Sequence, residues 1–311
     1  MKAVLQYRAS PELRRRICAL GLSTVVVEEG DKDTFRREMG DAEVLLHVLE
    51  PVTSEVIHTA PRLRLIQKIG IGVNTIDLDA ARRRGIAVCN MPGTNTQAVA
   101  ELTLLLMLAT LRRLAQLDSQ TRAGRGWEFD PDLPDDLGEL SGRTVGLVGL
   151  GAVARRLVPI LRALGADVLY TSRQAVSDAP CPFLPLQDLL RVVDLLSLHL
   201  PLKPHTERLI DGAALAAMKQ GSILINTARG PLVDEAALCE ALERGHLRGA
   251  GLDVFAREPV EADNPLLRLP NVVVTPHLAW LTAETLERSL RVIAENCRRL
   301  RAGEALLHRV A

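Results

Sequence analysis

Residues 144–173, TVGLVGLGAVARRLVPILRALGADVLYTSR, decide the fold of the chain. They read as an apolar strand, a GxGxxA turn, a helical pattern and a second apolar strand, which is the order of a dinucleotide-binding unit. In this pattern Gly149 permits the tight turn, Gly151 lets the backbone approach a pyrophosphate, and the small Ala154 lets the helix pack on the strand. Unpaired N–H groups at the helix N-terminus would face the phosphates. The stretch therefore predicts a dinucleotide site.

The end of the second strand indicates which dinucleotide binds. An acidic residue about 20 positions past the glycines would bond the ribose 2′-hydroxyl of NAD, but this strand ends Tyr170-Thr171-Ser172-Arg173, without a carboxylate. A guanidinium suits a 2′-phosphate, which it can hold with two parallel hydrogen bonds. We therefore expect a preference for NADP(H), with NAD(H) possible. The alternative is that Arg173 is a solvated loop charge.

Composition limits the kinds of partner that the protein can bind. The chain has 311 residues, enough for about two domains. It carries 38 basic and 38 acidic side chains, so no net charge attracts nucleic acid or a membrane surface. We expect a small-molecule partner and neither of those two.

The cysteine pattern indicates neither a disulfide framework nor a zinc cluster, and no metal is expected. The cysteines are odd in number, widely spaced and without a CxxC pair: Cys18, Cys89, Cys181, Cys239 and Cys297. The N-terminus lacks the apolar run of a signal peptide. The longest apolar stretch, at residues 98–110, contains Glu101 and is too short to span a bilayer. The sequence therefore favours reduced thiols and a cytoplasmic protein.

Residues 1–95 alternate short apolar runs with charged helical patterns, as in a small parallel sheet with helices on both faces. We expect strands at 3–7, 24–27, 44–48, 63–69 and 86–89, and helices at 11–20, 33–39, 54–60 and 78–84. A long amphipathic pattern at 283–301 is expected to cross back and complete this domain. The predicted boundaries are 1–96 with 281–311 for a substrate domain, and 97–280 for a dinucleotide-binding domain inserted in it.

The middle of the chain shows a second alternation. It predicts strands at 193–199, 222–226, 249–254 and 272–274, and helices at 186–191, 213–218 and 235–244. Capping residues at 94–96 precede a Leu- and Ala-rich segment, which predicts a single helix over residues 98–121. Because its start is apolar almost all round, it is expected to lie between domains or subunits, or else to be a plain core helix. Residues 124–142 are expected to form a loop.

Three loops that leave strand ends carry side chains suited to hydride transfer to a 2-oxo acid. They contain Arg229, Glu258 and His277. A guanidinium can bind carboxylate and carbonyl oxygens, an imidazole can protonate the oxygen, and a carboxylate can orient the imidazole. Singly, the three residues could be a surface ion pair, a helix-start charge and a loop histidine. The pattern alone does not show that they converge.

These segments together resemble the D-isomer-specific 2-hydroxyacid dehydrogenases over nearly the whole chain. The matching motifs, in order, are GIGVNTID (70–77), NTQAVAE (95–101), the GxGxxA turn (149–154), HLPL (199–202), NTARG (226–230), GLDVF (251–255) and TPH (275–277). The resemblance implies an α/β protein of two Rossmann-like, doubly wound parallel-sheet domains with substrate in the cleft between them. The substrate domain would be flavodoxin-like and discontinuous. Members commonly pair through the cofactor domain, so a homodimer is expected.

By the family pattern, Arg229 binds substrate, Glu258 assists and His277 is the acid/base. The loop at 70–73 would offer N–H groups to the substrate carboxylate, and the further substrate contacts implied are Leu49, Ile71, Gly72, Val73 and Trp280. The cofactor contacts implied are Thr96, Gly149, Gly151, Ala152, Val153, Ser172, Arg173, Pro201, Thr206, Thr227, Ala228 and Asp253, the last beside the nicotinamide amide. A helix cap, a turn proline and core packing are the alternatives for Thr96, Pro201 and Trp280. His199 is expected to belong to the scaffold.

The departures from the family pattern narrow the prediction. Residues 170–174 resemble the NADP(H)-using glyoxylate and hydroxypyruvate reductases. The loop at 47–50 has no arginine for a substrate phosphate, which disfavours a phosphorylated substrate. We therefore expect an NADP(H)-preferring dehydrogenase that reduces glyoxylate, hydroxypyruvate or a similar small 2-oxo acid. The alternatives are an NAD(H)-dependent enzyme for another acid and a non-catalytic, dinucleotide-sensing protein of the corepressor kind.

Overall fold

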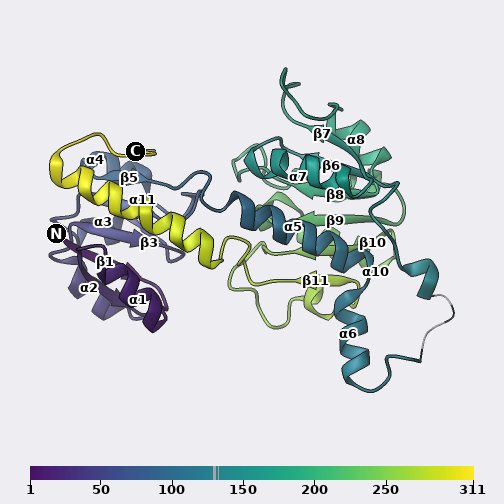
Figure 1. Cartoon of the computed structure of the whole chain (residues 1–311), viewed down its shortest axis with the longest axis horizontal. Helices are drawn as coiled ribbons and strands as arrows, with labels where there is room; N and C mark the ends of the chain where they lie inside the picture. The colour runs from purple at the N-terminus through teal and green to yellow at the C-terminus, as the bar shows by residue number, and fades with distance from the viewer. Residues whose placement is uncertain (129–130, 132) are drawn as a thin grey trace. The chain divides into compact units, whose positions relative to one another are not determined.

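The computed structural model describes residues 1–128, 131 and 133–311. The chain divides into two compact units: unit 1 is Met1–Asn95 with Leu281–Ala311, and unit 2 is Thr96–Trp280. Each unit contains one parallel β-sheet with helices (Figure 1). The prediction of two parallel-sheet α/β domains is confirmed.

Unit 1 has a five-stranded sheet in the order β2-β1-β3-β4-β5, which is the flavodoxin-like order predicted from the resemblance. The strands are β1 (Lys2–Gln6), β2 (Ser23–Val27), β3 (Val44–His47), β4 (Leu65–Lys68) and β5 (Ala87–Cys89). The helices are α1 (Pro11–Cys18), α2 (Lys32–Met39), α3 (Ser54–His58), α4 (Leu78–Arg83) and α11 (Ala283–Ala302). The strands and the first four helices lie within a few residues of the predicted ranges. Each of these helices begins after a capping residue that is visible in the sequence, such as Ser10 before α1.

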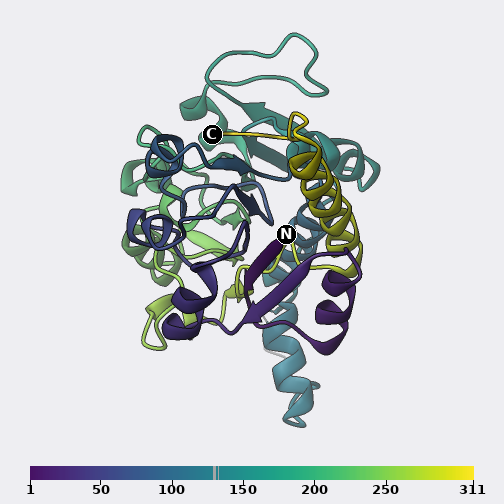
Figure 2. The same cartoon turned by 90° about the vertical axis from the view of Figure 1, so that its left-hand side faces the viewer.

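The last segment of the chain completes unit 1, as Figures 1 and 2 show for α11. The buried Asn296 of α11 donates to Gln67 Oε1 of β4 at 2.7 Å. Beyond the helix, Val88 N of β5 donates to Ala311 O at 3.0 Å, and Val310 N donates to Val88 O at 2.8 Å. Residues more than 200 positions apart in the sequence therefore share one sheet edge and one buried amide pair.

Unit 2 has a six-stranded sheet in the order β11-β10-β9-β8-β6-β7. The strands are β6 (Thr144–Val148), β7 (Asp167–Thr171), β8 (Leu195–Leu198), β9 (Ser222–Asn226), β10 (Leu247–Leu252) and β11 (Val272–Val274). The helices are α5 (Thr96–Leu111), α6 (Leu114–Arg122), α7 (Ala152–Ala163), α8 (Leu186–Val192), α9 (Gly212–Ala217) and α10 (Glu235–Glu243). The strand order reverses at β6, and open α/β sheets bind ligands at the carboxyl end of such a switch point.

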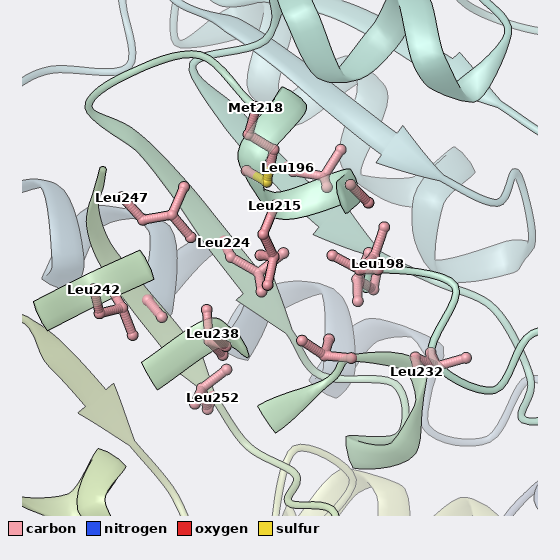
Figure 3. Close-up of a cluster of buried hydrophobic side chains, with 14 of the residues drawn as sticks. Leu196, Leu198, Leu215, Met218, Leu224, Leu232, Leu238, Leu242, Leu247 and Leu252 are labelled. Atoms are coloured by element: carbon pink, nitrogen blue, oxygen red, sulfur yellow. The ribbon is translucent and has the colours of Figure 1, made fainter. Parts of the chain in front are cut away.

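Alternate residues of the unit 2 strands fill two separate cores, one on each face of the sheet. Leu196 and Leu224 pack in one cluster with side chains of α9 and α10, as Figure 3 shows, and with Leu189 and Leu190 of α8. Leu195 and Ile223, their neighbours in sequence, pack in the other cluster with α5 and α7. Burial on both faces explains why these strands read as continuous apolar runs.

The prediction of one helix over residues 98–121 is wrong. The structure has α5 and α6, with a break at Arg113, whose φ of 47° lies in the left-handed region. Arg113 forms an ion pair with Asp136 at 3.0 Å, and Gly138 N donates to Leu111 O at 2.9 Å, so the chain beyond α6 returns to hold the break. α6 has no buried residue, and Figure 2 shows it extending away from the sheet of its unit.

The predicted loop at 124–142 contains a short 3-10 helix, Leu133–Asp136. Residues 129, 130 and 132 of this loop lie outside the described part of the chain.

Within the described ranges, no helix is both long and apolar enough to cross a membrane. The same residues contain no cluster of three or more His, Cys, Asp or Glu side chains that could hold a metal ion. All five cysteines have free thiols, and burial raises the pKa of Cys89 and Cys297 to about 11.

Candidate active site

Arg229, Glu258 and His277 lie on three loops at one edge of the unit 2 sheet. The loops follow β9, β10 and β11, which are parallel neighbours in the sheet. Because parallel strands end at the same edge, loops far apart in sequence meet there. The convergence that the sequence pattern left open is therefore a property of the strand order.

Glu258 and His277 form a close hydrogen-bonded pair. His277 Nδ1 and Glu258 Oε2 are 2.6 Å apart, and Phe255 N donates to the other carboxylate oxygen at 3.0 Å. Burial by itself would raise the pKa of Glu258, but these hydrogen bonds and the charges of His277 and Arg229 outweigh it, so the pKa lies below its usual value. Glu258 is therefore ionised at neutral pH and fixes Nδ1 of the imidazole, which leaves Nε2 facing outward from the pair.

The Arg229 guanidinium lies within electrostatic reach of Glu258. The side chain is half-buried, and burial lowers the pKa of Arg229 while the Glu258 carboxylate partly offsets that effect. Its Nη1 donates to Ala228 O at 2.5 Å, and its carbonyl accepts from Asn226 Nδ2 at 2.9 Å. Backbone and side chain are thus both held at the end of β9, with further N–H groups available to an anionic ligand.

A second close contact joins the loops that carry Arg229 and Glu258. A Cβ built on Gly230 would lie 1.9 Å from the carbonyl carbon and oxygen of Phe255. Only glycine fits there, so the backbones of the two loops touch. This glycine sets the approach of the guanidinium and the carboxylate.

Asp253 organises the loop that carries His277. It is fully buried, and its carboxylate accepts from Thr275 Oγ1 at 2.5 Å, Leu278 N at 3.0 Å and Ala279 N at 2.9 Å. Burial raises the pKa of Asp253, and these hydrogen bonds lower it only in part. The Asp253 carbonyl also accepts from His277 N at 2.7 Å.

His277 has a φ of 52°, a left-handed conformation that is uncommon for residues other than glycine. Such backbone strain persists where the surroundings enforce it, and it concentrates at functional sites. Here the conformation is enforced by the hydrogen bonds that the loop donates to Asp253. Trp280 Nε1 donates to His277 O at 3.1 Å and closes the same turn.

The glycine turn after β6 fits a dinucleotide pyrophosphate. Gly149 has a φ of +100°, and a Cβ there would lie 2.8 Å from His199 O, whereas a Cβ on Gly151 would meet nothing within 4 Å. α7 begins directly after Gly151 without a side-chain cap, so the N–H groups of Ala152 and Val153 have no capping side chain. Open space in front of uncapped N–H groups is the arrangement that binds phosphate.

The other predicted cofactor residues lie in unit 2 near these strand ends. Thr96 Oγ1 at the start of α5 is buried without a hydrogen-bond partner among the described residues. Thr206 Oγ1 donates to Pro201 O at 2.8 Å and so shapes the loop after β8. Thr227 Oγ1 contacts Thr103 Oγ1 at 2.8 Å, and Ala228 N donates to Asn226 Oδ1 at 3.0 Å. A bound ligand could satisfy Thr96, while Thr206 and Thr227 already have protein partners.

The loop after β7 presents Arg173 to solvent. Ser172 Oγ donates to Gln174 O at 2.5 Å, and Arg173 is exposed with no ion pair among the residues described. The loop does contain a carboxylate, Asp178, but Arg155 of α7 binds it at 2.9 Å. The carboxylate is therefore neutralised, and the guanidinium at 173 is available.

The substrate residues predicted from the resemblance outside unit 2 lie on two loops of unit 1. Leu49 follows β3, while Ile71, Gly72 and Val73 follow β4, and these strands are parallel neighbours. Leu49 and Ile71 are 45% and 42% exposed, which is unusual for large apolar side chains. Both side chains are open to solvent beyond the carboxyl ends of neighbouring strands of unit 1.

Two polar residues of unit 1, Lys68 and His47, were not predicted from the sequence as site residues. The buried Lys68 at the end of β4 donates from Nζ to Val48 O, so a cation does lie against the 47–50 loop. His47 Nε2 bonds to Glu50 O at 2.7 Å, and burial together with the charge of Lys68 lowers the pKa of His47 to about 3. The available signal was a lysine at the end of a strand, shortly before the glycine-containing loop at 70–73.

His199, which was expected to belong to the scaffold, contacts a residue of β8. Its Nε2 contacts Ser197 Oγ at 2.9 Å, and burial lowers the pKa of His199 to about 4, so the ring is neutral.

Comparison with protein families gives one match that covers more than half of the chain. The model described as "D-isomer specific 2-hydroxyacid dehydrogenase, NAD binding domain" matches residues 104–279. These residues include the glycine turn and the loops of Arg229, Glu258 and His277.

Individual proteins match over greater lengths. A D-3-phosphoglycerate dehydrogenase of Mycobacterium tuberculosis is 40% identical over 295 residues, which are 93% of this chain and 55% of that protein. The chain thus spans about half the length of that relative. A glyoxylate reductase of Korarchaeum cryptofilum is 37% identical over 279 residues, 88% of this chain and 84% of the relative.

Among solved structures, the NADPH-dependent glyoxylate/hydroxypyruvate reductase of Sinorhizobium meliloti, in complex with NADP and malonate, superposes with a TM-score of 0.86. It is 30% identical, and the match covers 100% of this chain and 96% of that one.

Proposed function

Because the chain belongs to the D-isomer-specific 2-hydroxyacid dehydrogenase family, we propose that it reduces a small 2-oxo acid to the 2-hydroxy acid with NADPH. The observation that carries the proposal is the 2.6 Å pair of His277 and Glu258 with the Arg229 guanidinium beside it. When bound, the reduced nicotinamide supplies the hydride. The protein must supply a proton and a group that binds the substrate anion, and it must exclude water from the reacting atoms.

His277 is proposed as the proton donor. Since Glu258 occupies Nδ1, the proton that leaves during reduction comes from Nε2 and goes to the carbonyl oxygen of the substrate. The ionised Glu258 stabilises the imidazolium before transfer and holds the ring in one orientation. Positioned acids of this kind contribute about 10²- to 10⁴-fold to rate.

Arg229 is proposed to bind the substrate carboxylate. A guanidinium can make two parallel hydrogen bonds to a carboxylate, and partial burial strengthens them by excluding water. The hydrogen bond from Nη1 to Ala228 O fixes one nitrogen of the guanidinium. The bound 2-oxo acid would then present its carbonyl oxygen to His277.

For the cofactor we propose a preference for NADP(H). Arg173 is exposed and the one carboxylate of its loop, Asp178, is paired with Arg155. The Sinorhizobium meliloti relative is NADPH-dependent by its description. NAD(H) is the second candidate, because the matching family model is described as an NAD binding domain.

For the substrate we propose glyoxylate, hydroxypyruvate or a 2-oxo acid of similar size. Both reductases named above act on such compounds by their descriptions. A phosphorylated acid is the second candidate, since the Mycobacterium relative is a phosphoglycerate dehydrogenase and Lys68 places a cation against the 47–50 loop. The loop itself has no arginine, which favours the smaller acids.

A spectrophotometric screen tests the proposal. The purified protein is mixed with NADPH or NADH and with glyoxylate, hydroxypyruvate or phosphohydroxypyruvate, and loss of the reduced cofactor is followed. We expect turnover with NADPH and the two small acids. NADPH binding without turnover on any acid would favour a dinucleotide-sensing protein instead.

We also propose a homodimer formed through α5. Leu105 and Leu108 of α5 and Leu114 of α6 are 53%, 38% and 52% exposed, and such apolar side chains on neighbouring helices suit an interface. Light scattering should give twice the chain mass. The free, mostly buried thiols fit a reducing compartment, so we propose a cytoplasmic location, which fractionation can test.

A further inference from the structure

Beyond the buried Phe255, the loop that carries Glu258 has few buried side chains. This loop, residues 255–264, follows β10. Residues 256–259 are exposed as whole residues, although the Glu258 side chain itself is only 34% exposed. Loops with few buried contacts open readily. Hydrogen bonds to the loop therefore help to set the position of the Glu258 carboxylate, together with the close contact of Phe255 with Gly230.

Glu235, the first residue of α10, makes such bonds at both ends of the loop. Its Oε2 accepts from Ala256 N at 2.8 Å, and its Oε1 accepts from Asn264 Nδ2 at 2.6 Å. The two residues that donate to Glu235 are eight positions apart, so one carboxylate bridges the two ends of the loop. Glu235 is half-buried and forms no ion pair among the described residues, so both of its oxygens serve the loop.

The bond to Ala256 N acts next to the peptide that holds Glu258. Phe255 N, one residue earlier, donates to Glu258 Oε1, and Glu258 Oε2 in turn contacts His277 Nδ1. A shift of Ala256 therefore moves the donor that orients Glu258. Bonds to a charged acceptor are about twice as strong as neutral ones, which suits a carboxylate for this task.

The far end is fixed through Asn264. Its Oδ1 accepts from Leu266 N at 3.0 Å and caps the 3-10 helix Pro265–Arg268, while its amide nitrogen donates to Glu235. α10 itself is anchored to the sheet by the buried Leu238 and Leu242. The loop is thus tied to a rigid helix at one point and to a capped turn at the other.

From this geometry we propose that Glu235 is a positioning residue for the reaction. It acts through Glu258, because its two hydrogen bonds bridge the ends of the loop at residues 255–264. The inference rests on the proposed function, because it assigns Glu258 its role beside His277. It does not place Glu235 in contact with substrate or cofactor.

The test is a double-mutant comparison. Glu235→Ala is measured alone and in a Glu258→Gln background, with Glu240→Ala as control, since Glu240 is an exposed acid on the same helix that pairs with Arg244. We expect Glu235→Ala to lower kcat about 10- to 100-fold, the effect of a misplaced catalytic group, with KM for NADPH unchanged. In the Glu258→Gln background the same substitution should lower kcat less than about twofold, because no carboxylate remains to be positioned.

Equal losses in both backgrounds, or the same kcat for Glu235→Ala and Glu240→Ala, would overturn the inference. If Glu235→Ala does not fold, Asn264→Asp replaces the amide donor with a second carboxylate facing Glu235 and should show the same dependence on Glu258. Amide hydrogen exchange of the same variants measures how well the loop at residues 255–264 is held, and it does not depend on enzyme activity. Faster exchange confined to residues 255–264 supports the bridging role of Glu235 and unchanged exchange refutes it, even if no acid is reduced and the proposed function fails.

Discussion

Replacing Gly230 with alanine tests how closely the loops of Arg229 and Glu258 must approach. The added Cβ would lie 1.9 Å from Phe255, whereas ordinary contact begins at 3.4 Å. One loop must therefore move by about 1.5 Å, because the obstacle is the Phe255 backbone, which cannot rotate away as a side chain can. Phe255 is also the residue whose N–H orients Glu258.

The expected result is a large loss of turnover with a moderate loss of stability. A misplacement of about 1 Å can lower the rate about 100-fold, and forced packing costs about 1–3 kcal/mol of unfolding free energy. Steady-state kinetics with NADPH and a 2-oxo acid give the first quantity. Denaturant unfolding of the same samples gives the second.

Gly212→Ala is the matched control. Gly212 begins α9, and a Cβ there would meet only Ala237 Cβ at 3.6 Å, an ordinary contact. This variant should keep both turnover and stability. The reasoning about Gly230 is refuted if Gly230→Ala behaves like Gly212→Ala in both measurements.

Three further predictions concern the site. His277→Ala should lower kcat by about 10²- to 10⁴-fold and leave NADPH binding, followed by fluorescence, nearly unchanged; an equal loss of binding would contradict an acid/base role. Arg173→Ala removes a charged hydrogen bond of about 1.5–3 kcal/mol, so KM should rise about tenfold or more for NADPH and little for NADH. Equal changes for the two cofactors would remove the argument for NADP(H). Because the folded-state pKa of Glu258 is below its ordinary 4.5, its ionisation stabilises the fold above that pH, and this contribution is lost as pH falls through the lower folded value. Wild type should therefore lose its stability advantage over Glu258→Gln on acidification, as urea unfolding at pH 7 and pH 3 would show.

Most of the fold could be predicted because its signals are local. Apolar runs, capping residues and glycines lie next to the elements that they specify, so strands such as β9 (Ser222–Asn226) and β11 (Val272–Val274) match their predicted ranges. The break between α5 and α6 could not be found in this way. Its left-handed residue is Arg113, and the contacts that hold it come from Asp136 and Gly138, more than 20 positions later.

For the candidate site too, the residues that are adjacent in sequence could be predicted and the long-range contacts could not. The glycine turn could be predicted, since its residues are adjacent in sequence. The meeting of Arg229, Glu258 and His277 could be inferred only from the resemblance, because it depends on the order β9, β10, β11 in the sheet. The bonds of Asp253 to the His277 loop, and of Glu235 to the Glu258 loop, leave no pattern in the sequence, since each links residues at least 21 positions apart.

The way unit 1 is completed sets an order on folding during synthesis. Residues 281–311 leave the ribosome after all of unit 2, yet β5 needs Val310 and Ala311, and Gln67 needs Asn296. Until then the nascent unit 1 carries an open strand edge, which invites misassociation, and the side-chain oxygen of Gln67 lacks its Asn296 donor. Unit 2 is continuous in sequence and can finish first. We therefore expect unit 1 to depend more on chaperones, although most of it is translated first.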